Sequence, residues 1–119
     1  MNKNSWDFGQ KGEAIAADLC REKNYIIIEK NYRTPAGEID IIAKDGDVFV
    51  FIEVKARSGI GYGAPYEAVT QQKRNKIRKA ALSYIRRFRK EVPCRFDVIS
   101  IQMKNGRPEA EHIIDAFEV

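Results

Sequence analysis

Charged residues inside two apolar segments constrain this chain more than any other feature. Residues 37–57 read GEIDIIAKDGDVFVFIEVKAR, in which Asp40 interrupts the first apolar run and Glu53 and Lys55 interrupt the second. The Asp45-Gly46 pair between the runs is typical of a tight β-hairpin. A buried carboxylate is costly unless it is paired or holds a metal ion. A hairpin that keeps two of them therefore indicates a site.

The pattern of apolar residues predicts a helix, three strands, a second helix, a fourth strand, and a last strand or extended tail. Ile77, Ala81, Tyr84 and Phe88 recur at helical spacing and predict the buried stripe of the second helix. This order, αβββαβ, predicts an α/β fold with a mixed central sheet flanked by helices, in a single domain over 1–119. A glycine-rich loop is expected at 58–65. The predicted elements are a helix over 9–24, strands over 25–32, 38–44 and 48–56, a helix over 66–91, a strand over 95–102 and a last segment over 113–119.

The composition excludes several classes of protein. No apolar run approaches the ~20 residues of a membrane span, so no membrane partner is expected. The first eight residues, MNKNSWDF, contain no apolar signal core, which favours a cytoplasmic protein. Cys20 and Cys94 are then expected to be reduced thiols. A single histidine and no Cys-x-x-Cys pair make a zinc site improbable.

The positive charge is concentrated in one segment. Residues 71–95 contain ten Lys and Arg residues and one acid, whereas the rest of the chain has 11 basic and 16 acidic residues. Such a basic block predicts a surface that binds a polyanion such as nucleic acid. A solvated helix face is the other interpretation of the same charges. The candidate nucleic-acid-binding residues are Lys73, Arg74, Lys76, Arg86, Arg87 and Lys90.

The charges of the hairpin have the composition of a metal site. Glu53 and Lys55 are two residues apart on one strand and so point to the same face. Pairing about the Asp45-Gly46 turn places Asp40 opposite residues 51–53, within reach of Glu53. Two nearby carboxylates can bind Mg²⁺ or Mn²⁺, and the lysine can act on a metal-bound water or a phosphate. The alternative is an ion pair on a solvated sheet face. The strands are apolar on both faces, and this pattern disfavours the alternative.

Longer motifs resemble a known family. Asp40, followed after twelve residues by Glu53-Val54-Lys55, resembles the PD-(D/E)xK nuclease signature, although Ile39 stands where many such nucleases have proline. The whole set resembles the YraN family of small bacterial proteins, which is similar to archaeal Holliday junction resolvases. The set comprises Gly12-Glu13, Ala16-Ala17, Asn31, Arg33, GEID at 37–40, FIEVKAR at 51–57, Gly63, Pro65, EAV at 67–69 and Lys73.

The resemblance implies a fold and a set of roles. It implies a restriction-endonuclease-like αβββαβ core, with Asp40 and Glu53 as metal-binding acids and Lys55 as the catalytic lysine. Glu13 matches a first-helix acid that completes the metal site, whereas sequence alone would interpret it as an acid near a helix N-terminus. Resolvase-like nucleases usually form dimers, which implies a homodimer as one state of this chain.

Two functions follow from these patterns. The first is a Mg²⁺- or Mn²⁺-dependent endonuclease that hydrolyses DNA, with branched or damaged DNA as candidate substrates. The second is a non-catalytic nucleic-acid-binding module with a vestigial metal site. The full set of Asp40, Glu53 and Lys55 favours the endonuclease. Composition does not separate DNA from RNA.

Overall fold

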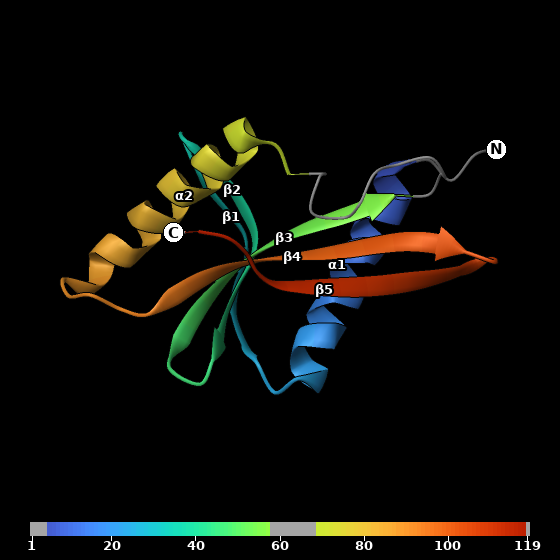
Figure 1. Ribbon diagram of the computed structural model, residues 1–119, viewed down its shortest axis with the longest axis horizontal. Coiled ribbons are helices and arrows are strands. Elements are labelled where there is room, and N and C mark those ends of the chain that lie inside the picture. The colour runs from blue at the N-terminus through green and yellow to red at the C-terminus, as the bar shows by residue number, and fades with distance from the viewer. Residues whose placement is uncertain (1–4, 58–68, 119) are drawn as a thin grey trace.

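The structure is one five-stranded sheet with a helix on each face. It is a computed structural model that describes residues 5–57 and 69–118 (Figure 1). The strands lie in chain order, β1-β2-β3-β4-β5. All neighbouring pairs are antiparallel except β3 and β4, which are parallel. The elements are α1 (Ser5–Glu22), β1 (Ile26–Thr34), β2 (Gly37–Asp45), β3 (Val48–Arg57), α2 (Gln71–Ile85), the 3₁₀ turn η2 (Arg86–Phe88), β4 (Cys94–Lys104) and β5 (Arg107–Phe117).

The predicted α/β architecture with a mixed sheet is confirmed, and it has the element order of a restriction-endonuclease-like core. The parallel pair needs a crossover, and α2 lies within that crossover on one face of the sheet. Its core includes Ile42, Phe51 and Phe96. On the other face α1 covers a second core that includes Ile41, Val50 and Ile99. The central strands are therefore apolar on both faces, as the sequence predicts.

The second helix differs from its predicted range of 66–91. Within the described residues α2 begins at Gln71, because the Thr70 side chain accepts a hydrogen bond from the Lys73 amide at 3.1 Å and caps the helix. The α-helix ends at Ile85 and continues as η2 to Phe88. Arg89 then adopts φ 55°, a left-handed conformation that stops the helix four residues before Pro93.

The apolar stripe of α2 packs largely as predicted. Ile77, Ala81 and Tyr84 are buried. The Tyr84 ring makes edge contacts with Phe49 and Phe51 of β3. Phe88 packs against the same core but is only partly buried, because it lies in η2 instead of the α-helix.

Other predicted ranges need smaller corrections. The first helix spans Ser5–Glu22, and the last strand is longer than predicted because Asn105-Gly106 forms a tight turn that lets β5 begin at Arg107. The loop predicted at 58–65 lies outside the described residues. Cys20 and Cys94 are free thiols, as expected. None of the helices in the described part of the chain is long and apolar enough to cross a bilayer.

Two glycines allow the helices to approach the sheet closely. A Cβ atom on Gly12 of α1 would lie 2.6 Å from the Ala56 Cβ of β3. A Cβ atom on Gly37 of β2 would lie 3.0 Å from the Lys76 backbone oxygen of α2. Both distances are shorter than an ordinary carbon contact. These glycines therefore set the distances of α1 and α2 from the strands that carry the acids.

Candidate functional site

The site forms where β2 separates from β3. The β2–β3 ladder runs from the Asp45–Val48 pair to the Ile41–Ile52 pair and stops there. One step further, the Asp40 carboxylate takes the place of a ladder carbonyl, since its Oδ2 accepts a hydrogen bond from the Val54 amide at 2.8 Å. The predicted pairing, with Asp40 opposite residues 51–53, is the register of this hairpin. Asp40 therefore closes the end of the ladder with its side chain.

The strand changes phase at Asp40. Ile39 belongs to the core under α2, whereas Ile41, two residues later, belongs to the core under α1. An ideal strand would place both on one face. On β1, Lys30 pairs with Ile41 and Tyr32 with Ile39, and Asn31 between them has φ 54°. The irregularity thus affects both β1 and β2. On β2 it lies at Asp40, whose carboxylate accepts the hydrogen bond from the Val54 amide of β3.

Glu53 is a buried carboxylate between two lysines. Its side chain is 5% exposed, and its Oε2 lies 3.5 Å from the Lys55 Nζ and 3.0 Å from the Lys73 Nζ. Glu53 and Lys55 share a face of β3, as predicted, while Lys73 comes from the first turn of α2. An ion pair is present, as in the alternative interpretation, but its carboxylate is withdrawn from solvent. The sheet face is not a solvated one at this point.

The charges of the site shift the pKa values of Asp40 and Lys73. Burial and the neighbouring Glu53 carboxylate raise the pKa of Asp40 to about 7, against the opposing effect of the Val54 hydrogen bond. The charges of Glu13 and Glu38 raise it further. Burial acts to lower the pKa of Lys73, but the Glu53 carboxylate outweighs it and the pKa is raised. The site thus holds acids that repel one another and lysines that partly compensate for them.

Glu13 reaches this environment from the other side of the sheet. It follows Gly12, the residue at which α1 approaches Ala56 of β3. Its side chain is half-buried, and its charge acts on Asp40. The structure therefore brings Asp40, Glu53 and Lys55 together, and it places Glu13 near enough for its charge to act on Asp40.

A cavity of about 190 Å³ opens beside the acids. A water molecule occupies about 30 Å³ in the liquid, so the cavity has room for a hydrated cation or a phosphate group. It lies between the beginning of β2, the middle of β3 and the first turns of α2. Its lining residues are Gly37, Glu38, Asp40, Glu53, Lys73, Lys76 and Ile77.

The donor set is suited to a hard divalent cation. Asp40 and Glu53 provide carboxylate oxygens, which Mg²⁺ and Mn²⁺ prefer. Their mutual repulsion is the condition that a bound cation relieves. No three acidic, histidine or cysteine side chains in the described ranges already stand at metal-binding distance. At Glu53 the Lys73 ammonium lies 3.0 Å from the carboxylate oxygen.

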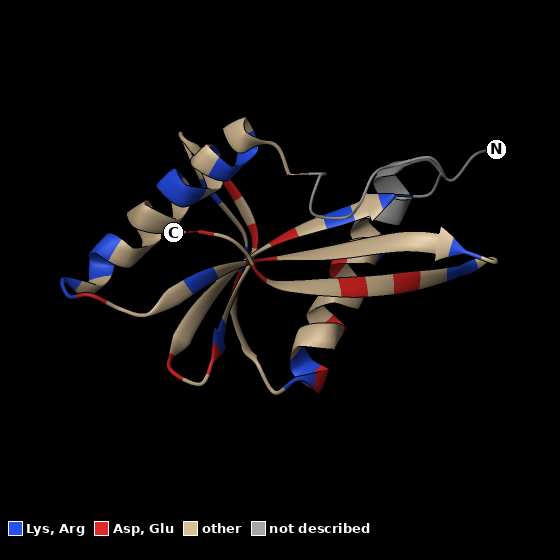
Figure 2. Ribbon diagram, viewed as in Figure 1, with Lys and Arg blue, Asp and Glu red and all other residues tan. Residues whose placement is uncertain are grey.

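The basic residues of the second helix divide into different environments. Figure 2 shows Lys and Arg on successive turns of α2. Arg74 donates to the Val69 carbonyl and lies over the Phe117 ring, and Arg87 lies 4.1 Å from the Tyr84 ring. Lys76, Arg86 and Lys90 are exposed. Among the candidate nucleic-acid residues, Lys73 pairs with Glu53, and Lys76 lines the same cavity.

The sequence analysis missed a buried ionic cluster on the α1 face. Asp97 of β4 is fully buried and accepts hydrogen bonds from Arg95, from His112 Nε2 at 2.8 Å and from the Asp115 amide. Lys23 contacts His112 Nδ1, so this nitrogen accepts and Nε2 carries the proton given to Asp97. An acid inside the apolar run of residues 96–101 was the signal that could have revealed it. The cluster ties β4 to β5.

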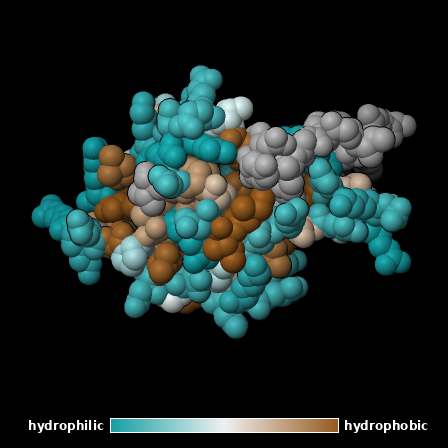
Figure 3. Space-filling view, in the orientation of Figure 1, coloured by the Kyte–Doolittle hydropathy of each residue, from teal (hydrophilic) through white to brown (hydrophobic). Residues whose placement is uncertain are grey.

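Hydrophilic side chains cover both ends of the molecule, and hydrophobic residues show between them (Figure 3). The charged groups of the candidate site differ from the hydrophilic side chains of this surface, because they are partly or fully buried. Buried titratable groups with a shifted pKa beside a cavity, as Asp40 is here, are typical of functional sites.

Comparison with known proteins places the chain among bacterial relatives. The model of "Uncharacterised protein family UPF0102" matches residues 12–101. A UPF0102 protein of Thermodesulfovibrio yellowstonii is 50% identical over 111 residues, which cover 93% of this chain and 96% of the relative. One of Geobacter metallireducens is 44% identical over 120 residues, covering 100% and 98%. One of Clostridium botulinum is 46% identical over 117 residues, covering 95% of each. The match includes every residue assigned to the acid site.

Proposed function

The chain belongs to the uncharacterised protein family UPF0102, the YraN family that its motifs indicated, and we propose that it is a divalent-metal-dependent endonuclease acting on DNA. The observation that carries the proposal is the pairing of Asp40 and Glu53 where β2 leaves β3. Two acids that raise each other's free energy, two lysines and a cavity in one place have no evident use in a purely structural sheet.

Asp40 and Glu53 would hold the metal ion, with Glu13 as a further carboxylate. Bound Mg²⁺ or Mn²⁺ would lower the pKa of a water molecule and offset charge on the phosphate. Lys55 holds a positive charge beside Glu53, where it can orient the attacking water or stabilise the charge that develops on the phosphate. Lys73 can leave Glu53 and bind a phosphate oxygen, because its side chain is partly exposed at the cavity.

The partners follow from the same surface. The basic residues of 71–95 support binding to nucleic acid through the phosphate backbone, without reading of base sequence. The two free thiols support a cytoplasmic location. Branched or damaged DNA and a homodimer are parts of the proposal that rest on the family resemblance.

One observation favours the second candidate, a nucleic-acid-binding module with a vestigial metal site. Lys55 and Lys73 already compensate the charge of Glu53, so the fold does not need a metal ion to tolerate this acid. In that case the site would bind a phosphate through its lysines and would not cleave it.

A cleavage assay separates the two candidates. The purified protein is incubated with linear, single-stranded, flapped and four-way DNA in Mg²⁺ or Mn²⁺, together with the variants Glu53→Gln and Lys55→Ala. Calorimetry with Mn²⁺ measures metal binding to the same proteins. The endonuclease proposal expects Glu53→Gln to lose both metal affinity and cleavage, and Lys55→Ala to keep metal affinity and lose cleavage. A wild-type protein that binds DNA, binds no divalent metal and cuts none of the substrates would leave the binding module as the function.

A further inference from the structure

We infer that one flank of α2, together with the 34–37 turn between β1 and β2, holds a nucleic-acid strand by its phosphates and leads it to the cavity of Asp40 and Glu53. The inference rests on the proposed function, because it assigns the path of that function's substrate. It separates the basic residues of α2 into those that bind the strand and those that hold the fold.

The basic residues on the β5 side of α2 already have partners. The Arg78 guanidinium lies over the Phe117 ring at 5.3 Å, and its Nε donates to the Glu118 carbonyl at 2.8 Å. Arg74 lies over the same ring at 5.4 Å and donates to the Val69 carbonyl. These two arginines attach the end of β5 to α2. Their guanidinium groups are committed to the fold.

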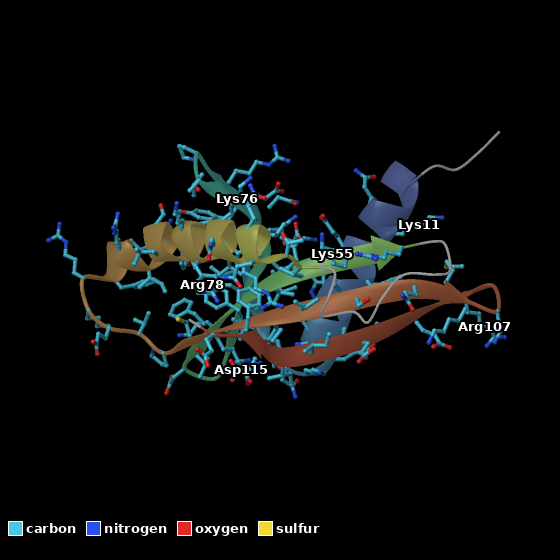
Figure 4. The ribbon with its side chains drawn as sticks, turned by 45° about the horizontal axis from the view of Figure 1, so that its top comes forward. Lys11, Lys55, Lys76, Arg78, Arg107 and Asp115 are labelled. Atoms are coloured by element: carbon cyan, nitrogen blue, oxygen red, sulfur yellow. The ribbon has the colours of Figure 1, made fainter. Side chains whose placement is uncertain are left out.

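The basic residues on the other flank have no such partners. Lys76, Lys79 and Arg86 are exposed, and within the described residues their side chains make no hydrogen bond or ion pair. At 3.6 residues per turn these three residues fall within an arc of about 80° on the helix. Figure 4 shows Lys76 and Arg78 on opposite sides of α2. Three cations without partners therefore form one row.

Two hollows connect this row with the acids. The cavity of about 190 Å³ that contains Asp40 and Glu53 is lined on the α2 side by Lys73, Lys76 and Ile77. A second hollow of about 300 Å³ is lined by Lys79, Leu82 and Ser83 on α2, by Arg86 at the start of η2, and by Thr34, Pro35 and Ala36 on the turn. The two hollows follow each other along α2 and share the same turn as their opposite wall. We call them together the α2 trough.

The turn that forms this wall is held in place. The Thr34 hydroxyl accepts hydrogen bonds from the Ala36 and Gly37 amides and donates to the Gly37 carbonyl, each at 3.1 Å. Gly37 also permits the close approach to Lys76. The trough is therefore formed before any ligand binds, which lowers the entropic cost of binding.

The dimensions and chemistry of the trough suit a phosphate backbone. Ten residues separate Lys76 from Arg86, a rise of about 15 Å. With one phosphate per about 3.4 Å of each strand, that length spans about four phosphates. None of the described residues that line the trough is aromatic, so bases have no ring to stack on. Recognition should depend on charge and not on sequence.

The test is DNA binding as a function of salt concentration, measured by fluorescence anisotropy in EDTA so that no cleavage occurs. The trough variant replaces Lys76, Lys79 and Arg86 by Gln. Each lost phosphate contact should reduce the slope of log K against log salt by about 0.9 on duplex DNA and about 0.7 on a single strand. The expected reductions are therefore about 2.7 and about 2. If the two proteins have the same duplex affinity when extrapolated to 1 M salt, the trough variant should bind duplex DNA about 500-fold more weakly than the wild type at 0.1 M salt.

A matched variant controls for total charge. It replaces Lys30, Lys104 and Arg107 by Gln, which removes the same charge from exposed positions away from α2, Arg107 at the far tip of the β4–β5 hairpin (Figure 4). Its salt slope should stay at the wild-type value, and both variants should keep the wild-type melting temperature. A reduced slope on the single strand shows that the trough holds an unpaired strand, whereas a reduction on the duplex alone shows that it holds one strand of a duplex.

Equal losses in the two variants, or a trough variant with an unchanged slope, would overturn the inference. A wild-type protein that binds DNA through the trough but cleaves nothing in Mn²⁺ would overturn the proposed nuclease function and leave the trough standing. Calorimetry with Mn²⁺ on a variant that replaces only Lys79 and Arg86 by Gln should match the wild type, because neither residue lines the cavity of Asp40 and Glu53.

Discussion

Replacing Gly12 by alanine tests whether the position of α1 against the sheet is as close as the structure shows. The new Cβ would lie 2.6 Å from the Ala56 Cβ, while the next nearest side-chain atom, Ile101 Cδ1, would lie at an ordinary 3.7 Å. Carbon atoms rest about 3.5–4.0 Å apart, so the helix would have to move away from β3 by about 1 Å. The substitution therefore concentrates its strain on one contact.

Two effects of opposite sign determine the stability of Gly12→Ala. Overpacking of a close contact costs ~1–3 kcal/mol. Alanine in place of glycine inside a helix stabilises by ~1 kcal/mol. The net change is therefore a loss of up to ~2 kcal/mol, in which the two effects are combined. Combining Gly12→Ala with Ala56→Gly separates the two effects, because Ala56→Gly removes the methyl group that the new Cβ would meet.

A double-mutant cycle provides the measurement. In the Ala56→Gly background, Gly12→Ala should stabilise by ~1 kcal/mol, so the coupling free energy between the two positions should be ~1–3 kcal/mol. Urea denaturation of the four proteins gives this value from the free energies of unfolding, provided the m-values agree. A coupling within ~0.5 kcal/mol of zero would refute the close approach. Mn²⁺ titration adds a functional measurement, since Gly12→Ala should displace Glu13 and weaken binding, and Ala56→Gly should restore it.

Three further predictions concern the core, the ladder and the ionic cluster. Ile77→Ala removes a side chain that is 2% exposed under α2 and should cost ~2–5 kcal/mol in urea denaturation; an unchanged midpoint would mean that α2 is not packed there. Asp40→Asn keeps an oxygen that can accept the hydrogen bond from the Val54 amide, whereas Asp40→Ala leaves this amide without a partner. The alanine variant should therefore be less stable than the asparagine variant by ~1–3 kcal/mol. Equal stabilities would show that this hydrogen bond does not stabilise the end of the β2–β3 ladder. The hydrogen bonds from His112 and Arg95 outweigh burial and lower the pKa of Asp97, so this residue stabilises the fold above its unfolded pKa of about 3.9 and that stability is lost as pH falls through its lower folded value. Thermal melts between pH 5 and about 2.5 should show this loss in the wild type and a flatter profile in Asp97→Asn, and parallel profiles would exclude Asp97 as its source.

The sequence predicts the elements of this fold because each has a local signal. Asp45-Gly46 specifies the turn of the β2–β3 hairpin, and the Asp40–Glu53 proximity follows from counting residues outward from it. The spacing of Ile77, Ala81 and Tyr84 identifies the buried face of α2. The ends of α2 were less predictable, because the Thr70 cap and the left-handed Arg89 are properties of the backbone that residue type only suggests.

Other features of the site depend on contacts that no local pattern carries. The phase change at Asp40 lies opposite Asn31 of the neighbouring strand, which has a left-handed conformation. Lys73 reaches Glu53 only through the packing of α2 on the sheet, although its position near the helix start was visible. The division of the basic residues likewise depends on where Phe117, at the end of the last strand, meets α2. Tertiary packing determined each of these, and composition alone showed only that charge was present.

The arrangement of the strands in chain order has a consequence for folding. The β1–β2–β3 meander and the β4–β5 hairpin close through short turns, so each can form quickly from local contacts. The parallel β3–β4 pair forms only when residues 58–93 close a long loop, which is the most costly contact in chain entropy. Glu53 lies opposite Val98 in this pair. The Asp40–Glu53 pair therefore comes together early, within the β2–β3 hairpin, whereas Lys73 reaches Glu53 only after α2 docks on the sheet. A chain with the hairpin formed and α2 undocked holds the two acids without the Lys73 charge.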